Sequence, residues 1–551
     1  MNIKLLRWCL VLIIVRCSIP LYGQGEWNNW YFGVKAGVTF QNGSPPTVLM
    51  NSSVIAPHVS NVISDSSGQL LFYTQGLELY NRLHQIMQNG YLLHGGEVLE
   101  NVVSVPLPGS RTLFYIFTNG WIKPPPYTGY TFEYNIVDMT LDNGNGGVLP
   151  GYKNVLVPGT ELSDGGITAV VHQNKRDYWI IVPVSETTKR FHSYLLTKGG
   201  LQPPVISLMP MLNTWLGGKA IYRIRASQDG KRIVALTFDN DEELAYFSFN
   251  PTTGVVSSLF TFKIPGNYDP HSAEFSVSNR YLYVFAQKGG TNDHGIWRFD
   301  TSKTDSTEFV KSREKVVSTN YYGKMQLGPD NKIYLSKRTS FSISIDSISV
   351  IKYPDLPVDQ CGYQDNYVGL LGRSSADCLP SFIRRYFAYI HHSGFCQGAS
   401  ICFEPNTWPP PDSLWWDFGD PSSGVANFSN DSTPEHNYNA PGIYTVKMIV
   451  RHVDMRYDTA TLNLTIEPQP MPNLGPDRMV CQDQPVILNA GFNPQWTYLW
   501  GTGETTPTIT VTNSGTYSVT VTSPNGCTGS DEVVLSIIPG STPEPKPIKH
   551  N

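Results

Sequence analysis

The amino-acid sequence predicts an all-β protein of several domains, and three observations lead to this expectation. The 551-residue chain contains 48 Gly, 41 Pro and 30 Tyr but only 15% charged residues, a composition that suits short strands and tight turns. The chain is also too long for a single hydrophobic core. A pattern of turn, alternating apolar strand and second strand recurs between residues 30 and 390. We therefore expect a succession of β domains.

The first 24 residues have the order of a secretory signal peptide. Lys4 and Arg7 precede an apolar run at residues 8–15, which a zone of small and turn-forming residues follows. This run is shorter than the roughly 20 residues that cross a bilayer, and we expect no transmembrane segment elsewhere. Cys17 is a poor lipoprotein anchor because the charged Arg16 precedes it. The sequence thus predicts export to the cell surface or the extracellular space, with the periplasm as an alternative.

Residues 25–390 are predicted to form a β-propeller of about seven blades. Turns rich in Gly or Asn recur about 40 to 65 residues apart, close to the spacing of four-stranded blades with their loops. These turns are marked by Gly68, Gly109, Asn174, Gly230, Asn279 and Asn331. A seventh blade forms if the strand at 30–40 joins the segment at 382–390 and closes the ring. One apolar residue of each repeat is expected to pack between blades: Phe72, Tyr115, Ile180, Leu236, Tyr283 and Leu335.

Residues 391–468 are predicted to form a small β-sandwich. In a strand, adjacent Trp415 and Trp416 point to opposite faces, so only one of them can anchor the core. Downstream, Gly442-x-Tyr444 opens an alternating strand in the manner of a tyrosine corner. The aspartates of the segment WWDFGD stand beside glycine, where side-chain oxygens commonly cap turn amides. A metal site or an acid/base pair is the alternative interpretation of these carboxylates.

Residues 469–538 are predicted to form a second, immunoglobulin-like sandwich. Cys481, Trp500 and Cys527 follow the order of a sandwich whose tryptophan packs on a disulfide between its sheets, and Tyr517 suits the tyrosine corner. The tail at residues 539–551 is rich in proline and polar residues, and we expect it to be disordered.

Six cysteines follow the signal peptide. An even number of cysteines in an exported protein indicates disulfides rather than metal ligands, and no Cys-x-x-Cys occurs. Pairing of sequence neighbours, which is one of about 15 connectivities that six cysteines allow, is our expectation. It joins Cys361 to Cys378, Cys396 to Cys402 and Cys481 to Cys527.

The predicted first sandwich resembles a polycystic-kidney-disease (PKD) domain, in which a Trp-Asp-Phe-Gly-Asp strand and turn precedes a His-x-Tyr-x-x-x-Gly-x-Tyr segment. The matching residues are Trp416, Asp417, Phe418, Gly419, Asp420, His436, Tyr438, Gly442 and Tyr444. The resemblance implies an immunoglobulin-like sandwich in which Asp417 and Asp420 shape a turn.

Nearly the whole mature chain resembles secreted surface proteins of Gram-negative gliding bacteria, the substrates of type IX secretion. The segments EWNNWYFGVKAGVTF, YIFTNG and LPSFIRRYF are similar to the propeller of that family, which a PKD domain and a PKD-like domain follow. Members usually end in a sorting domain for type IX secretion, which this sequence does not show, so the resemblance leaves the export route and surface attachment open.

Few residues suggest chemistry. The sequence contains no nucleophile elbow, phosphate-binding loop, metalloprotease helix or dinucleotide fingerprint. Loose acid and histidine candidates stand in segments that read more simply as solvated turns or strand edges: Asp164, His172, Asp239–Glu243, Asp269, His271, Glu274, Asp293, His294, His391 and His392. Aromatic residues beside Gly or Pro are candidates for stacking on sugars or holding peptide: Trp121, Tyr127, Tyr130, Trp215, Tyr321 and Tyr322.

These observations favour an exported, non-enzymatic binding or adhesion protein. A glycan or protein would bind the propeller face, other cell-surface proteins are further candidate partners, and the sandwiches would act as spacers. The formal net charge of −5 and the absence of a basic cluster larger than Arg384-Arg385 argue against a nucleic-acid partner. We expect no cofactor, metal or catalytic residue. Two alternatives remain: a subunit of a surface secretion or motility assembly, and a propeller hydrolase or lyase that acts on polysaccharide.

Overall fold

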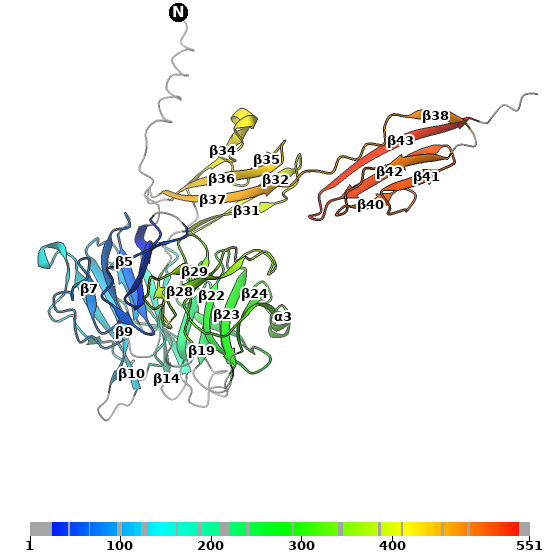
Figure 1. Ribbon diagram of the computed structural model, residues 1–551. Helices are drawn as coiled ribbons and strands as arrows, with labels where there is room; N and C mark the ends of the chain where they lie inside the picture. Colours follow the sequence, from blue (N-terminus) through cyan, green and yellow to red (C-terminus); the bar gives the residue numbers. More distant parts are fainter. Residues whose placement is uncertain are drawn as a thin grey trace, which may run out of the picture. The chain divides into compact units, whose positions relative to one another are not determined.

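The computed structural model describes residues 25–538 except for 42–43, 66, 96–101, 123–128, 161–162, 186–188, 210–220, 238–242, 289–290, 292, 340–344, 384–386, 409–410, 453–456 and 482–484. The predicted signal peptide and the predicted tail lie outside the described residues. The chain divides into two compact units, residues 1–387 with 407–410 and 454–458, and residues 388–406, 411–453 and 459–551. The strands of the first unit run from blue to green in Figure 1, and those of the second from yellow-green to red.

The described residues are almost entirely strands and turns, so the predicted all-β class is confirmed. Their helical segments are short: η1 (Gly25–Trp27), η2 (Asp142–Gly144), α3 (Ser306–Lys311) and η3 (Pro421–Asn427). Across these described segments, no helix combines the length and apolar character needed to span a membrane.

The described strands of the first unit form seven sheets of four or five strands. The first sheet has the order β3-β2-β1-β4, the second β30-β5-β6-β7, and the third β11-β10-β9-β8 with β12 also on β10. Their strands are β1 (Asn29–Val34), β2 (Ala36–Thr39), β3 (Thr47–Val48), β4 (Ile55–Ala56), β5 (Ser60–Ser64), β6 (Leu70–Thr74), β7 (Leu79–Asn81), β8 (Val102–Pro106), β9 (Leu113–Ile122), β10 (Gly129–Asp138), β11 (Gly147–Val148), β12 (Val155–Leu156) and β30 (Pro380–Ser381).

The remaining four sheets follow one another along the chain. Their orders are β13-β14-β15-β16 with β17 also on β15, β18-β19-β20-β21, β22-β23-β24-β25 and β26-β27-β28-β29. Their strands are β13 (Thr168–Val171), β14 (Tyr178–Ser185), β15 (Lys189–Thr197), β16 (Gly200–Leu201), β17 (Val205–Leu208), β18 (Ile221–Ala226), β19 (Arg232–Thr237), β20 (Glu243–Phe249), β21 (Val256–Lys263), β22 (Tyr268–Phe275), β23 (Tyr281–Lys288), β24 (His294–Asp300), β25 (Glu314–Thr319), β26 (Met325–Leu327), β27 (Ile333–Leu335), β28 (Ser347–Ile351) and β29 (Tyr363–Gly369).

Consecutive sheets share hydrophobic clusters. Phe72 of β6 packs edge-on against Phe114 of β9, with ring centroids 5.4 Å apart, and similar clusters join the sheets from β8 through β25. Trp30 of β1 packs in the same way against Tyr334 of β27 at 5.5 Å, so the first and last of the consecutive sheets also share a cluster. The six apolar residues expected between blades are at most 8% exposed, which confirms that they are core.

The prediction that the strand at residues 30–40 pairs with residues 382–390 was wrong. β1 pairs with β2 along residues 29–32 and with β4 at Gly33 and Val34, and within the described residues no ladder joins β1 to 382–390. Instead, β30 pairs in parallel with β5, where Pro380 lies opposite Ser60. The chain from residue 387 onward forms β31 and pairs with β32. β1 thus pairs with strands that lie close to it in the sequence, and not with the later segment that we expected.

The second unit contains two groups of sheets, each with its own core. Trp416 is 2% exposed in the core of the first group and Trp500 is 1% exposed in that of the second. The first group has the orders β31-β32-β35 and β34-β33-β36-β37, and the second β38-β43-β42-β40 and β39-β41. The strands are β31 (Phe387–Ser393), β32 (Ser400–Trp408), β33 (Ser413–Asp417), β34 (Phe428–Ser429), β35 (Glu435–Asn437), β36 (Gly442–Arg451), β37 (Tyr457–Ile466), β38 (Arg478–Cys481), β39 (Val486–Asn489), β40 (Thr497–Trp500), β41 (Thr508–Val511), β42 (Gly515–Thr522) and β43 (Thr528–Ile538).

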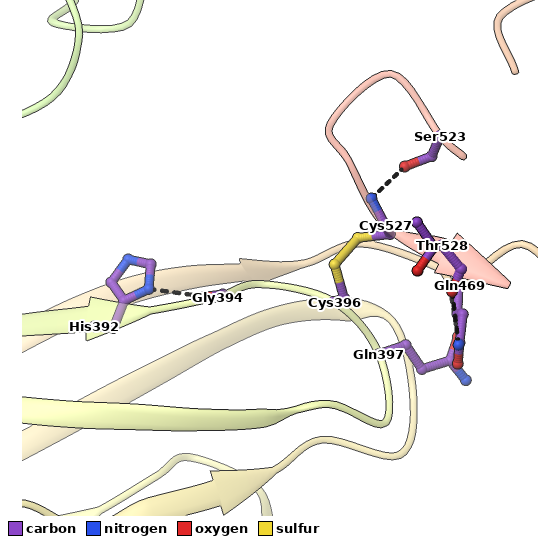
Figure 2. The surroundings of a disulfide bond; sticks show 8 residues. All are labelled: His392, Gly394, Cys396, Gln397, Gln469, Ser523, Cys527 and Thr528. Atoms are coloured by element: carbon purple, nitrogen blue, oxygen red, sulfur yellow. Dashed lines mark hydrogen bonds between the residues drawn. A yellow bond between two sulfur atoms is a disulfide. The ribbon is translucent and has the colours of Figure 1, made fainter. Parts of the chain in front are cut away.

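A disulfide joins Cys396 to Cys527, across 131 residues of sequence (Figure 2). Cys396 lies between β31 and β32, and Cys527 lies in the turn between β42 and β43. Beside the bond, the Gln469 side-chain amide donates to the carbonyl oxygen of Thr528 at 2.9 Å. The disulfide therefore connects the two sheet groups of the second unit.

The predicted pairing of sequence neighbours was wrong, and strand geometry explains why. Cys481 lies opposite Ile538, at the far end of β43 from Thr528. Ten residues of strand span about 33 Å, whereas bridged Cα atoms lie within about 7 Å. Four cysteines carry no disulfide in the described structure: Cys361 and Cys378, which are buried, and Cys402 and Cys481.

Candidate functional site

A cleft of about 650 Å³ opens between the sheet of β22–β25 and the sheet of β26–β29. Its volume lies within the range of small-ligand sites. Each side chain in its lining carries a hydroxyl, amide or carboxylate group: Thr291, Asp293, Ser318, Thr319, Asn320, Tyr321, Tyr363 and Asp365. We call this site the tyrosine–aspartate cleft.

Asp365 is the centre of the hydrogen-bond network in the cleft. Its Oδ1 atom lies 2.5 Å from Nζ of Lys337 and accepts hydrogen bonds from Ser349 Oγ at 2.6 Å and from the Tyr321 hydroxyl at 2.9 Å. The Tyr321 hydroxyl is also hydrogen-bonded to that of Tyr363. The side chain of Asp365 remains 45% exposed, whereas that of Lys337 is 2% exposed. The network therefore holds an accessible carboxylate in one orientation.

The electrostatics of the cleft keep this carboxylate ionised. Partial burial acts to raise the pKa of Asp365, but the hydrogen bonds from Lys337, Ser349 and Tyr321 outweigh burial and lower the pKa to about 2. Burial and the neighbouring tyrosine raise the pKa of Tyr321, so its hydroxyl keeps its proton. The cleft thus offers a permanent acceptor beside protonated phenols, an arrangement suited to binding hydroxyl groups.

The opposite wall carries a second ordered carboxylate. The Tyr268 hydroxyl donates to Asp293 Oδ2 at 2.6 Å, and this hydrogen bond is the main cause that lowers the pKa of Asp293. The ring of Tyr268 packs on that of Trp297 at 4.4 Å, and Nζ of Lys315 lies 3.9 Å from Asp293 Oδ1. Each aspartate of the cleft therefore has a lysine partner.

A buried ionic cluster lies behind Tyr322, the neighbour of Tyr321. Asp377, which is 3% exposed, accepts from His271 Nε2 at 2.9 Å and from Arg223 Nη2 at 3.2 Å. Burial opposes ionisation of Asp377, but His271 and Arg223 outweigh it and hold its pKa well below the usual range. Burial lowers the pKa of His271, which favours the neutral ring. His58 Nδ1 lies 3.9 Å from the same carboxylate oxygen.

The structure brings several of the loose sequence candidates together. Asp293 and Tyr321 line the cleft, while His271 and His294 pack against Tyr322 with ring centroids at 4.9 and 5.9 Å. Others lie in structural contacts: Asp164 bonds Lys189 at 2.8 Å, and Glu274 accepts from the backbone amides of Phe275 and Leu327. Candidates that fall outside the described residues are Tyr127, Trp215 and the segment 239–242, and the same holds for the side chain of Trp121.

Sequence reasoning missed Tyr363, Asp365 and Lys337. A signal was present, because residues 363 and 365 stand two apart in one strand and therefore share a face. Nothing in the sequence pattern indicates that Lys337 and Tyr321 meet that face, since they follow and precede other strands.

The residues on which the resemblance to a PKD domain rests, in the ranges 416–420 and 436–444, form a compact set of contacts in the second unit. Asp417 Oδ1 accepts from the Gly419 amide at 3.0 Å, a turn-capping bond. Asp420, which is 2% exposed, accepts from His436 Nε2 at 3.1 Å, and the His436 ring stacks on Phe418 at 4.5 Å. Two hydroxyl bonds to backbone carbonyls complete the set: Tyr438 to Phe418 at 2.9 Å and Tyr444 to Ala440 at 2.9 Å.

The second sheet group has a comparable tyrosine. The hydroxyl of Tyr517 donates to the carbonyl oxygen of Asn513, four residues upstream, at 2.8 Å. Trp500 donates from its indole nitrogen to the carbonyl oxygen of Thr506 at 2.8 Å and packs in a core that contains no disulfide. The predicted packing of Trp500 on a Cys481–Cys527 bond was therefore wrong.

Comparison with known proteins assigns neither family nor activity. No protein-family model matches the sequence, and no curated protein matches it. Among solved structures, a Bacteroides uniformis protein provisionally named 6-phosphogluconolactonase has 14% identity and a TM-score of 0.39 over 61% of this chain and 95% of that chain. AofleA from Arthrobotrys oligospora has 9% identity and a TM-score of 0.32 over 63% and 85%. Exo-β-1,3-galactanase from Phanerochaete chrysosporium has 8% identity and a TM-score of 0.28 over 69% and 92%. At such TM-scores these likenesses carry no argument about function.

Proposed function

We propose that this protein is an exported, non-enzymatic glycan-binding protein of the cell surface, and that the tyrosine–aspartate cleft is its sugar site. The observation that carries the proposal is the accessible Asp365 carboxylate, held ionised among the hydroxyl groups of Tyr321, Tyr363 and Ser349. Sugar recognition needs fixed acceptors and donors for several hydroxyl groups, together with aromatic surface for the ring. The cleft offers the fixed acceptor and the hydroxyl groups, and the partly exposed Tyr363 offers ring surface, whereas Tyr321 is only 4% exposed.

The proposed architecture is a propeller of seven blades followed by two immunoglobulin-like modules. Support for the propeller comes from the sheet orders, from hydrophobic clusters shared by consecutive sheets, and from the parallel pairing of β30 with β5, which joins the late chain to the early chain. Support for the modules comes from their paired sheets and from the corner-like bonds of Tyr444 and Tyr517. The family resemblance to surface proteins of gliding bacteria rests on sequence motifs alone and belongs to this proposal.

Export is supported by the N-terminal sequence and by the disulfide. A bond between Cys396 and Cys527 persists in oxidising compartments and is uncommon in a reducing cytosol. In this proposal the sheet groups of the second unit act as spacers.

The carboxylates of the cleft argue for binding rather than hydrolysis. A two-carboxylate glycoside hydrolase needs one carboxyl group that stays protonated near neutral pH. Hydrogen bonds outweigh burial at Asp365 and Asp293, and the pKa of each is lowered. Neither residue could therefore serve as the general acid.

One observation favours the hydrolase alternative at another place. Glu133 of β10 is 2% exposed, burial raises its pKa, and its Oε2 atom lies 2.9 Å from Nδ1 of the half-exposed His94. A carboxyl group with a raised pKa beside a histidine is a candidate acid/base pair.

Mass spectrometry separates the two functions. Each glycan that binds is incubated with wild type and with Glu133→Gln, and cleavage that Glu133→Gln abolishes would establish the enzyme.

The binding proposal is tested by screening the mature chain, residues 25–551, on a glycan array. We expect binding to a limited set of glycans and its loss in Asp365→Asn. Asp359→Asn, a change at an exposed carboxylate outside the cleft, is the matched control and should bind as wild type. Binding that Asp365→Asn leaves intact would refute the assignment of the cleft, and capture of protein partners with no glycan bound would favour the assembly alternative.

A further inference from the structure

The segments that supply Tyr321 and Lys337 to the cleft present a different set of side chains on their other face. Tyr322 and Arg338 are directly opposite each other: the Tyr322 amide donates to the Arg338 carbonyl at 3.0 Å, and the Arg338 amide donates to the Tyr322 carbonyl at 2.7 Å. Residues paired in this way carry their side chains on one face. Tyr321 directly precedes Tyr322, and Lys337 directly precedes Arg338, so their side chains point to the opposite face. There the lysine Nζ lies 4.8 Å from the centre of the Tyr321 ring.

Polar groups without partners gather on the face of Tyr322 and Arg338. The half-buried guanidinium of Arg338 has no hydrogen bond or ion pair with any described residue. His294 is 7% exposed, and its buried Nδ1 atom likewise has no partner among the described residues. The rings of His271 and His294 both meet Tyr322 edge-on. A buried polar atom without a partner costs free energy, and a ligand that supplied the partner would recover that cost.

The charge balance at this face is positive. Asp377 is the nearby carboxylate behind His271, and Arg223 already neutralises it at 3.2 Å. Burial is the main cause that raises the pKa of Tyr322, while Arg338 acts to lower it and Asp377 acts to raise it. The guanidinium of Arg338 therefore has no carboxylate partner among the described residues, and its planar fork matches a carboxylate.

We propose that Arg338, Tyr322, His271 and His294 form an oxyanion site that binds the carboxylate of an acidic sugar. This inference rests on the proposed glycan-binding function and specifies its ligand as a glycan that contains uronic acid. The tyrosine–aspartate cleft, whose walls carry two aspartates, would take the neutral hydroxyl-bearing part of the ligand. The two sites lie on opposite faces of the same pair of chain segments, and Asp293 of the cleft directly precedes His294 of the oxyanion site in the chain.

The test compares methyl glucuronide, methyl glucoside and sodium acetate as ligands of the mature chain in NMR titrations. We expect the glucuronide to bind about tenfold more tightly than the glucoside, because a charge-assisted bidentate contact is among the stronger hydrogen bonds. Acetate should bind more weakly than the glucuronide, since it lacks the sugar hydroxyl groups. Arg338→Gln should remove the preference for the glucuronide and keep the affinity for the glucoside. Arg82→Gln, at an exposed arginine away from both sites, is the control.

The outcomes separate this inference from the proposed function. Equal affinity for glucuronide and glucoside in wild type, or a preference that survives Arg338→Gln, would overturn the oxyanion site while leaving the cleft untouched. Acetate as tight as glucuronide would contradict recognition of a sugar. A glucuronide preference that Arg338→Gln removes, combined with glucoside binding that Asp365→Asn does not change, would support the oxyanion site and overturn the cleft. Binding of neither glycoside would overturn both.

Discussion

Lys337 Nζ lies 2.5 Å from Asp365 Oδ1, and this pair joins the segment after β27 to β29 at the edge of the proposed sugar site. The lysine is buried and the carboxylate is accessible, so the protein sets the charge state of the group that meets the ligand.

Glycan binding should not change between pH 8 and about pH 4. The folded pKa of Asp365 is about 2, below the usual value of 3.8 for an aspartate, so the carboxylate is ionised throughout that range. Because the folded pKa of Asp365 is lowered, the ionised carboxylate stabilises the fold above about pH 4, and this contribution is lost as the pH falls toward 2. Ligand binding by the carboxylate should be lost over the same range. Isothermal titration calorimetry across this range measures the effect. A binding transition centred between pH 5 and 7 would show that another group controls the site.

Lys337→Met should make binding sensitive to weak acid. The substitution keeps the length and the apolar stem of the side chain but removes the ammonium group that lowers the pKa of Asp365. The midpoint of acid inactivation should therefore move from near pH 2 toward about pH 4, the usual range of an aspartate. NMR titration of the Asp365 carboxyl carbon measures this shift directly. Lys231→Met, at an exposed lysine, serves as the control, and an unchanged midpoint in Lys337→Met would contradict the role of the ion pair.

Cys396→Ser should destabilise the second unit. Removing a cross-link between residues 131 apart restores loop entropy to the unfolded chain, worth up to roughly 5 kcal/mol in the chain-entropy model. Denaturant unfolding followed by tryptophan fluorescence measures the loss, and limited proteolysis should cut more readily between residues 467 and 473. Cys481→Ser removes an exposed thiol that has no bond and should leave both measurements unchanged. Equal stability of the two variants would show that the cross-link does not form.

Gly419→Ala, in the turn of the segment WDFGD, should lower the free energy of unfolding more than Gly424→Ala does. Both glycines have positive φ, +70° and +61°, but a Cβ atom at 419 would lie 2.5 Å from the Thr445 carbonyl oxygen, whereas nothing lies within 4 Å at 424. We expect a loss on the order of 3 kcal/mol at 419, from strain and a backbone clash, and about 1 kcal/mol at 424, from strain alone. Urea unfolding of the two variants gives the comparison. A larger loss at 424 would contradict the close approach of Gly419 to β36.

Local patterns were enough to predict the strands and their buried faces. Ile180 and Tyr283, for instance, stand in alternating apolar runs after turn residues, and both are fully buried in the second strand of their sheets. Alternation is a property of the strand itself, because successive side chains point to opposite faces. The turn markers behave similarly: Gly230 and Asn331 have positive φ, which their residue types tolerate.

Long-range partners were not predictable from such patterns. Sequence proximity suggested Cys396 with Cys402, yet the bond joins Cys396 to a turn of another sheet group. The cleft depends equally on distant partners, since Asp365, Lys337 and Tyr321 come from three separate segments. Each segment alone has the appearance of an ordinary strand or turn.

The sequence by itself determined the β character of the chain, its aromatic cores and the WDFGD turn, because alternation and turn chemistry act between residues close in the chain. Only the tertiary structure decided which cysteines pair, which strand lies beside β5, and which carboxylate is both ionised and accessible. Those outcomes depend on distances and burial between residues far apart in the chain, and a linear pattern contains no measure of either.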